Sequence, residues 1–186
     1  DDAVDLIEEM PANVVKRILR HTDPEMRSHI NNLLNYPKDS AGSIMTIEFV
    51  DLKEDMTISD AFTRIRRTGL DKETVYTCYV TNSHRKLEGV ITLKDLLMAD
   101  YDIKVGDIMI DTNIISATTN ENQESVAQTF KKYDLLALPV VDFENRIVGI
   151  ITVDDVFDVM EEETTEDIEK MAAITPSEKP YLKTSA

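Results

Sequence analysis

The pattern of apolar and polar residues along this chain occurs twice. A short β-branched run comes first, an amphipathic helix follows, and two further apolar runs flank a polar turn before another helix begins. The predicted strands are 49–52, 76–81 and 87–91 in the first stretch, and 113–117, 137–141 and 147–151 in the second. The order β-α-β-β-α, read twice, predicts a mixed α/β (α+β) fold.

The helix after the first strand of each stretch has an apolar face. In the first stretch Ile58, Ala61 and Ile65 share one side, and in the second Val126 and Phe130 do so. Thr57 precedes the first of these helices and Asp60 follows three residues later, which is the spacing of a capping box.

Two motifs recur almost unchanged, which indicates a tandem duplication. Ala41–Met45 (AGSIM) returns as Val105–Met109 (VGDIM), and Gly89–Leu96 (GVITLKDL) returns as Gly149–Val156 (GIITVDDV). The offset falls from 64 to 60 residues because the first copy carries extra residues around 69–74. One such unit leaves a sheet face uncovered, so we expect the two copies to pack on each other.

The flanks of the duplication have a different character. Residues 1–40 predict helices whose starts are marked by Pro11 and Pro24, because proline is tolerated at the first helical position. Residues 175–186 hold two prolines and no apolar period, which predicts a linker. The chain begins with Asp1 rather than Met, and we expect it to be a piece of a longer protein.

Composition narrows the classes of function. The 186 residues include 20 Lys and Arg against 36 Asp and Glu, a net charge of −16, which argues against nucleic acid as a partner. The longest apolar run, Leu135–Val141, is far shorter than the roughly 20 residues of a membrane-spanning helix. The single cysteine, Cys78, cannot form an internal disulfide, which fits a reducing compartment.

An uncompensated acidic run follows the second copy of the Gly-x-x-Thr motif. Nine acids lie between Asp154 and Glu169 with no Lys or Arg among them. Like charges three or four residues apart destabilise a helix by roughly 0.2–0.5 kcal/mol per pair. The run is either a solvated face or a site for a multivalent cation, and the residues alone leave both open.

Ligand chemistry restricts which cation that would be. Oxygen ligands without His or Cys favour Mg²⁺, Ca²⁺ or Mn²⁺ over zinc or copper. The chain has no EF-hand loop. Scattered carboxylates suit Mg²⁺, which keeps several of its waters.

Thr92 with Asp95, and Thr152 with Asp155, have two interpretations. Each pair fits the capping of a helix start, with the carboxylate near the positive end of the helix. Each also fits a ribose site in which the aspartate accepts hydrogen bonds from sugar hydroxyls. Spacing alone favours capping.

Catalysis has little support in the sequence. The chain lacks a P-loop and the Gly-x-Ser-x-Gly and His-Glu-x-x-His motifs, and His21, His29 and His84 have no ligand spacing and are expected at the surface. We therefore expect no enzyme, and keep a metal-dependent hydrolase only as a rival.

The repeated unit, closing in Gly-x-x-Thr-x-x-Asp, resembles the CBS (cystathionine-β-synthase) domain, here as a tandem pair. The preceding helices, the junction 39–46, the segments 132–142 and 152–160, and Thr165–Ile168 (TEDI) resemble the cytosolic region of the MgtE family of magnesium channels. The resemblance implies the end of a helical N domain at 1–40, CBS domains at 41–103 and 104–163, and at 164–186 a connecting "plug" helix and a linker toward a pore that this chain lacks.

The resemblance also implies a set of ligands for regulatory Mg²⁺. Residues matching the family's metal-binding acids are Asp1, Asp5, Asp134, Asp155, Asp158, Glu163, Glu166 and Asp167. We expect Asp155 and Asp158 to be exposed when no ion is bound. The family further implies a homodimer through the CBS pairs, a location at the cytoplasmic face of the membrane, and ATP or another adenine nucleotide at Thr92 and Asp95, although Thr77 and Cys78 offer that ligand no aromatic platform.

The resulting hypothesis is a cytosolic Mg²⁺ sensor whose acids bind Mg²⁺ and lock a pore closed. The chief rival is a CBS pair that senses an adenine nucleotide for another transporter or enzyme. The two differ in whether Mg²⁺ alone, without nucleotide, makes the chain more compact.

Overall fold

The computed structural model of the chain describes residues 35–174, apart from the side chains of Asp71 and of several residues late in the last helix. The helices predicted for 1–34 and the linker predicted for 175–186 lie outside these residues. So do Asp1, Asp5, His21 and His29.

Two three-stranded sheets confirm the predicted duplication. In each sheet a very short strand pairs in parallel with the middle strand, which pairs antiparallel with the third. The strands are β1 (Asp51–Leu52), β2 (Thr77–Thr81) and β3 (Leu87–Thr92) in the first sheet, and β4 (Ala117–Thr118), β5 (Ala137–Val141) and β6 (Ile147–Thr152) in the second. The predicted first strands were too long, because each forms only two paired positions with its neighbour.

Helices cover one face of each sheet. In the first half these are α5 (Ile58–Thr68), followed by the 3-10 turn η1 (Gly69–Asp71), and α6 (Leu93–Met98); in the second they are α8 (Gln123–Tyr133) and α9 (Val153–Ile174). The predicted capping box is confirmed: the Thr57 hydroxyl accepts from the Asp60 amide at 3.1 Å, and the Asp60 carboxylate accepts from the Thr57 amide at 3.1 Å.

The two halves exchange their leading segments. The short helix α4 (Ala41–Ile44) precedes the first sheet in sequence, yet the amide and carbonyl of Thr46 pair with those of Ile150 in β6, both at 2.8 Å. Likewise α7 (Val105–Ile108) precedes the second sheet, yet Ile110 pairs with Val90 in β3. Each folded half is therefore built from both sequence copies.

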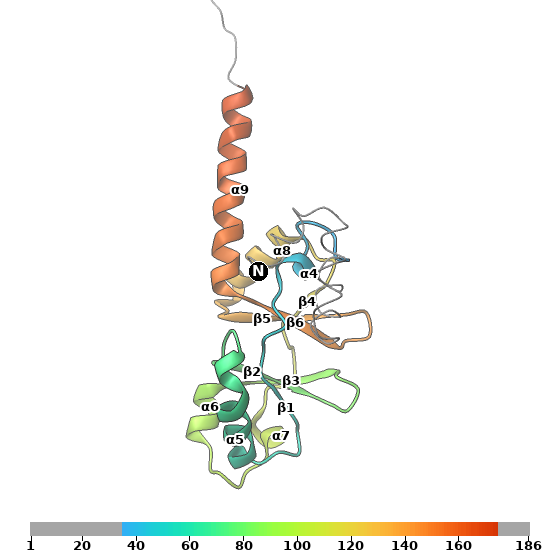
Figure 1. The fold of residues 1–186 in the computed structure, drawn as a ribbon, viewed down its shortest axis with the longest axis vertical. Helices are drawn as coiled ribbons and strands as arrows, with labels where there is room; N and C mark the ends of the chain where they lie inside the picture. Colours follow the sequence, from blue (N-terminus) through green and yellow to red (C-terminus); the bar gives the residue numbers. More distant parts are fainter. Residues whose placement is uncertain (1–34, 175–186) are drawn as a thin grey trace, which may run out of the picture.

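A third apolar cluster joins the halves. It contains Tyr79 and Leu87 from the first sheet and Val141, Ile147 and Ile150 from the second, while separate clusters lie beneath the helices of each half. The two hairpin turns also meet: Leu87 donates its amide to the Asn145 carbonyl at 3.0 Å, and Ile147 donates to Arg85 at 3.1 Å. Figure 1 shows the halves stacked along the long axis.

The last helix extends far beyond the sheets. Figure 1 shows α9 starting at the end of β6 and rising away from both halves as a single rod. The predicted second CBS helix and the predicted start of the plug helix thus form one continuous element. Between residues 35 and 174, the helices are all too short or too polar to cross a membrane.

Candidate ligand sites

The start of α9 carries the first predicted metal ligands. Asp155 is half-buried, and its Oδ2 accepts hydrogen bonds from the Thr152 amide at 3.0 Å and the Thr152 hydroxyl at 2.7 Å. Asp158 lies one turn further on and is exposed. The expectation of an exposed side chain was therefore correct for Asp158 and wrong for Asp155, which lies in the first turn of α9, a helix that packs against α8 and β6.

Further along α9 the acids face solvent wherever their side chains are described. Asp154, Glu161 and Asp167 are exposed, and the last turn of the helix has no basic residue. Glu163 and Glu166 lie in the α9 backbone, but their side chains fall outside the described set. Exposed acids on a rod that projects from the domain suit an ion that bridges to another part of the protein.

Asp134 occupies the end of α8, which packs against α9. Its backbone is left-handed, with φ 49° and ψ 46°, and its amide donates to the Phe130 carbonyl, so the residue closes the helix as a C-cap. Its side chain is exposed. Aspartate tolerates this conformation better than most residues, which gives Asp134 a structural role besides any role as a ligand.

The predicted acids do not form a complete ion site by themselves. Among the described residues, the structure contains no group of three or more His, Cys, Asp or Glu side chains arranged to hold a metal. A Mg²⁺ ion held by Asp134, Asp155 or Asp158 would therefore need water or ligands from another part of the protein, which is compatible with the way Mg²⁺ binds.

The predicted caps at Thr92 and Asp95 are confirmed. Asp95 donates its amide to the Thr92 hydroxyl at 3.1 Å, and the Asp95 carboxylate accepts from the Thr92 hydroxyl and, at 3.3 Å, from its amide. Asp95 is exposed, so its carboxylate remains accessible to a ligand.

The sequence pattern missed four exposed apolar side chains at equivalent places in the two halves. Tyr76 and Leu136 are 65% and 61% exposed, and Leu97 and Phe157 are 64% and 59% exposed. The Tyr76 carbonyl accepts a hydrogen bond from the first amide of α6 at 2.8 Å, and the Leu136 carbonyl accepts one from the first amide of α9 at 2.9 Å. Comparing the repeats residue by residue could have found these positions, since both pairs have the same 60-residue offset as the Gly-x-x-Thr motifs.

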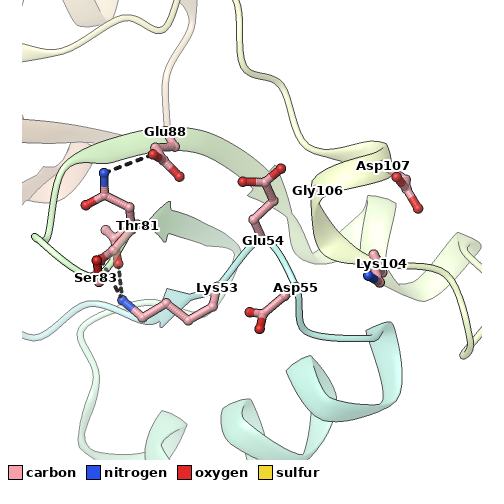
Figure 2. Close-up of a pocket in the computed structure, with 10 residues that line it drawn as sticks. Lys53, Glu54, Asp55, Thr81, Ser83, Glu88, Lys104, Gly106 and Asp107 are labelled. Atoms are coloured by element: carbon pink, nitrogen blue, oxygen red, sulfur yellow. Dashed lines mark hydrogen bonds between the residues drawn. The ribbon is translucent and has the colours of Figure 1, made fainter.

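A pocket of about 440 Å³ that is lined by polar and charged residues, and that the sequence did not predict, lies beside α7 in the first half. Figure 2 shows the Lys53 side chain extending toward Thr81. The Lys53 ammonium donates to Thr81 Oγ1 at 2.7 Å and to the Asn82 carbonyl at 3.2 Å, and Asn82 Nδ2 donates to Glu88 at 2.9 Å.

A second, more open hollow of about 910 Å³ lies between the hairpin turns. Arg146 pairs there with Asp142 at 2.7 Å and Glu144 at 2.8 Å. Partial burial acts to raise the pKa of Asp142, but hydrogen bonds from Arg146 and from the Glu144 amide outweigh it and lower that pKa. The pKa of Tyr36 is raised by burial and by the nearby Asp142 charge. The charge of Arg146 is therefore balanced by acids, whereas Arg85 and Lys86 also line this hollow.

Family models match both parts of the chain, the N-terminal segment and the duplicated region. Residues 1–39 match the family described as the MgtE intracellular N domain, and residues 41–102 and 105–162 match the CBS domain. The magnesium transporter MgtE of Thermus thermophilus is 40% identical over 173 residues, and that of Bacillus subtilis is 38% identical over 173 residues. Each alignment covers 93% of this chain and 38% of the relative, so the chain spans well under half of those proteins.

Two solved structures share the fold. The soluble part of a magnesium transporter has a TM-score of 0.83 at 37% identity, covering 87% of this chain and 62% of that one. The cytosolic domain of the Mg²⁺ channel MgtE in complex with ATP has a TM-score of 0.79 at 40% identity, covering 85% and 63%. Enzymes also match, but inosine-5'-monophosphate dehydrogenase of Bacillus subtilis aligns over only 16% of its length.

Proposed function

The chain belongs to the MgtE family, with the end of an N domain ahead of two CBS domains, and from that premise we propose that it is the Mg²⁺-sensing region of a magnesium transporter. The region would lie at the cytoplasmic face of the membrane, joined to a pore domain of its own. It would regulate that pore and catalyse no reaction.

The observation that carries this proposal is the acidic rod α9. Asp154, Asp158, Glu161 and Asp167 are exposed along a helix that projects from the domain and has no basic residue in its last turn. Repulsion between such charges favours a loose arrangement at low Mg²⁺. A divalent ion that bridges acids on different elements favours a compact one.

The lock follows from this difference between two states. At high Mg²⁺, ions shared among Asp134, Asp155, Asp158, Glu163, Glu166 and Asp167, together with Asp1 and Asp5, would hold α9 in one position and keep the pore closed. A ligand that binds only the compact state stabilises that state by about 2.7 kcal/mol at a hundredfold excess over its Kd. When Mg²⁺ falls, the acids repel and the helix is released.

Thermal unfolding and X-ray scattering test the lock on this chain. Millimolar MgCl₂ should raise the melting temperature and reduce the radius of gyration, whereas NaCl at equal ionic strength should do much less, because screening cannot bridge two carboxylates. The variant Asp158→Asn/Asp167→Asn should blunt the Mg²⁺ response without disturbing the cap at Asp155. A matched control, Asp102→Asn/Asp111→Asn, neutralises two exposed acids elsewhere and should respond like the parent.

Two outcomes would overturn the proposal. If NaCl compacted the chain as much as MgCl₂ does, the acids of α9 would be a solvated face and not an ion site. An unchanged Mg²⁺ response in Asp158→Asn/Asp167→Asn would show that these acids of α9 do not take part in sensing Mg²⁺.

We also propose an adenine-nucleotide site at Thr92 and Asp95, supported by the ATP complex of the similar MgtE domain. The Asp95 carboxylate is exposed beside the end of β3, where it can accept hydrogen bonds from ribose hydroxyls.

Calorimetry with ATP tests the proposed nucleotide site. Asp95→Asn keeps an oxygen for the cap but loses the charge, so it should weaken binding at least fivefold, whereas Asp155→Asn should leave binding unchanged. If Asp95→Asn bound ATP as tightly as the parent, Asp95 would only cap α6 and would not bind the nucleotide.

A homodimer completes the proposal. The exposed side chains of Tyr76, Leu97, Leu136 and Phe157 occupy equivalent places in the two halves, so they suit an interface formed by two-fold symmetry between two chains. Burying apolar surface contributes roughly 25 cal/mol per Å², so burial of these four large side chains would favour association.

A further inference from the structure

The hollow between the hairpin turns has an excess of cations on one of its two walls. The first wall is the turn 82–86, and the second is the turn 142–146, which lies 60 residues further along the chain. Figure 1 shows both hairpins projecting to the same side of the molecule. Tyr36, in the segment that matches the N domain, also lines the hollow. The hollow is therefore shared by all three matched parts of the chain, and small-molecule sites are common at such junctions.

The same hydrogen bonds build both turns. Asn82 Oδ1 accepts from the amides of His84 at 2.8 Å and Lys86 at 3.1 Å. Asp142 Oδ1 accepts from the amides two and four residues later at 2.9 and 3.0 Å. The amide oxygen of asparagine thus replaces the carboxylate oxygen without changing the turn. Only the charge differs, because asparagine is neutral.

This difference leaves the cations of the first turn without acids. Arg146 forms ion pairs with two acids of its own turn. The equivalent cation, Lys86, has Asn82 and His84 at the positions of those two acids. Among the described residues, neither Lys86 nor Arg85 takes part in an ion pair. The first turn therefore adds two unpaired cations to the hollow.

Two features make these cations unfavourable in the absence of a counterion. Lys86 and Arg146 are direct partners in an antiparallel bridge between the two hairpins. Like charges at directly opposite positions are destabilising. Arg85 is held in left-handed backbone at φ 64°, where a long side chain is disfavoured. Such a strained residue beside a cavity indicates a functional role.

We propose that the hollow binds a small phosphate-bearing anion, held between Arg85 and Lys86 of the first turn and Arg146 of the second. Guanidinium and ammonium groups donate strong, charge-assisted hydrogen bonds to phosphate oxygens. The volume of the hollow, about 910 Å³, accommodates a ligand of the size of a diphosphate. The site is separate from the proposed nucleotide site. Lys86 precedes β3 and Thr92 ends it, so at about 3.3 Å per residue the hollow lies roughly 20 Å from Thr92.

Titration of the ¹⁵N-labelled chain with pyrophosphate tests the proposal, in a buffer without Mg²⁺ because pyrophosphate chelates that ion. The amides of His84, Lys86 and Arg146 should shift in a saturable way. NaCl at equal ionic strength should not reproduce these shifts, since screening places no anion in the hollow. Asp95→Asn should bind pyrophosphate like the parent, so the result is independent of the proposed nucleotide site.

Variants separate binding in the hollow from general attraction of an anion to the surface. Arg85→Asn/Lys86→Gln should keep the turn, because asparagine already holds the position equivalent to Arg85. It should weaken pyrophosphate binding at least about tenfold, since two charge-assisted contacts are lost. Arg67→Gln/Lys131→Gln removes the same charge from exposed positions of α5 and α8 and should leave binding unchanged. Asp142→Asn removes an acid that pairs with Arg146 and should strengthen binding.

ADP distinguishes two sources of the diphosphate group. If ADP shifts the same amides of Asp95→Asn as tightly as pyrophosphate does, the ligand is the phosphate chain of a nucleotide; if it binds more weakly, the ligand is a free diphosphate. Shifts that spread over the surface without saturating would overturn the proposal, as would equal effects of the two double variants or no gain in Asp142→Asn. Binding to phosphatidylglycerol vesicles without any pyrophosphate shift would overturn it too, because the cations would then contact a membrane.

Discussion

At the scale of residues, the two hairpin turns place different residue types in the same left-handed backbone conformation. Arg85 and Asn145 hold the same place in the two halves and both adopt left-handed backbone, with φ of 64° and 62°. Asparagine visits this region readily, whereas a long side chain with a Cβ is disfavoured there. Arg85 recovers part of the cost through a long contact of 3.5 Å with the Ile147 carbonyl.

Exchanging these two residue types should therefore move stability in opposite directions. Arg85→Asn should raise the free energy of unfolding by about 1 kcal/mol, since it relieves left-handed strain. Asn145→Arg should lower it by a similar amount and also lose the contact of Asn145 Nδ2 with the Leu87 carbonyl at 3.2 Å. Urea unfolding of both variants is the measurement. A fall in stability for Arg85→Asn would show that the arginine contact outweighs the strain.

Tyr79 presents the opposite situation, a polar atom placed in an apolar core. The side chain is fully buried between the sheets, and its hydroxyl has no hydrogen-bond partner among residues 35–174. Burial raises the pKa of this hydroxyl, and the neighbouring Cys78 raises it further. The ring still packs edge-on against Phe49, with centroids 5.9 Å apart.

Removing that hydroxyl should not cost stability. Tyr79→Phe keeps the ring contacts and removes a buried unsatisfied group, so we expect the free energy of unfolding to rise by about 1 kcal/mol. Tyr101→Phe, on an exposed tyrosine, serves as the control and should change little. A marked loss of stability in Tyr79→Phe, read from thermal unfolding, would mean that the hydroxyl has a partner outside residues 35–174.

At the scale of elements, the starts of α6 and α9 use the same Thr-x-x-Asp device with different consequences. Asp95 is exposed and Asp155 is half-buried, and each accepts hydrogen bonds from the threonine three residues before it. α6 ends after six residues, whereas α9 continues for 22 and carries the acidic run. The cap at Thr152 therefore anchors the helix that we propose as the moving part of the sensor.

Loss of each cap should be measurable independently of any ligand. Thr92→Ala and Thr152→Ala should each lower the free energy of unfolding by about 1 kcal/mol, the usual value of an N-cap. Thr→Ser at the same positions should retain most of the stability, because the hydroxyl that accepts from the Asp95 amide at Thr92, and donates to the Asp155 carboxylate at Thr152, remains. If Thr152→Ala unfolded like the parent, the hydrogen bonds of Asp155 would suffice to start α9.

At the scale of the whole molecule, the exchange of leading segments ties the two halves together. α4 packs on the second sheet and α7 on the first, so neither sequence copy forms a complete folded half. The central cluster around Tyr79 and Ile150 adds a shared core. We therefore expect one cooperative unfolding transition for both halves.

Association of two such molecules should depend on the exposed apolar pairs. Leu97→Glu/Phe157→Glu should shift the chain to a monomer in light scattering at tens of micromolar, because two charges would have to be buried in the interface. Lys94→Glu/Asp154→Lys, at neighbouring exposed positions of the same helices, should keep the parent's mass. A monomeric parent would contradict the proposed dimer directly.

The sequence by itself determined the duplication, the β-α-β-β-α order of each copy, the caps at Thr57 and Thr92, and the acidic run on α9, but the short helices α4 and α7 were not predicted. The duplication depends on motifs that recur 60 to 64 residues apart, and the other features on residue types at local spacings of two to four residues, which the chain displays whatever surrounds it. The tertiary structure alone decided the exchange of α4 and α7, the half-buried state of Asp155, and the pocket beside Gly106. Each of these depends on contacts between residues far apart in the chain, such as Thr46 with Ile150 and Gly42 with Thr119, and no local period of the sequence records them.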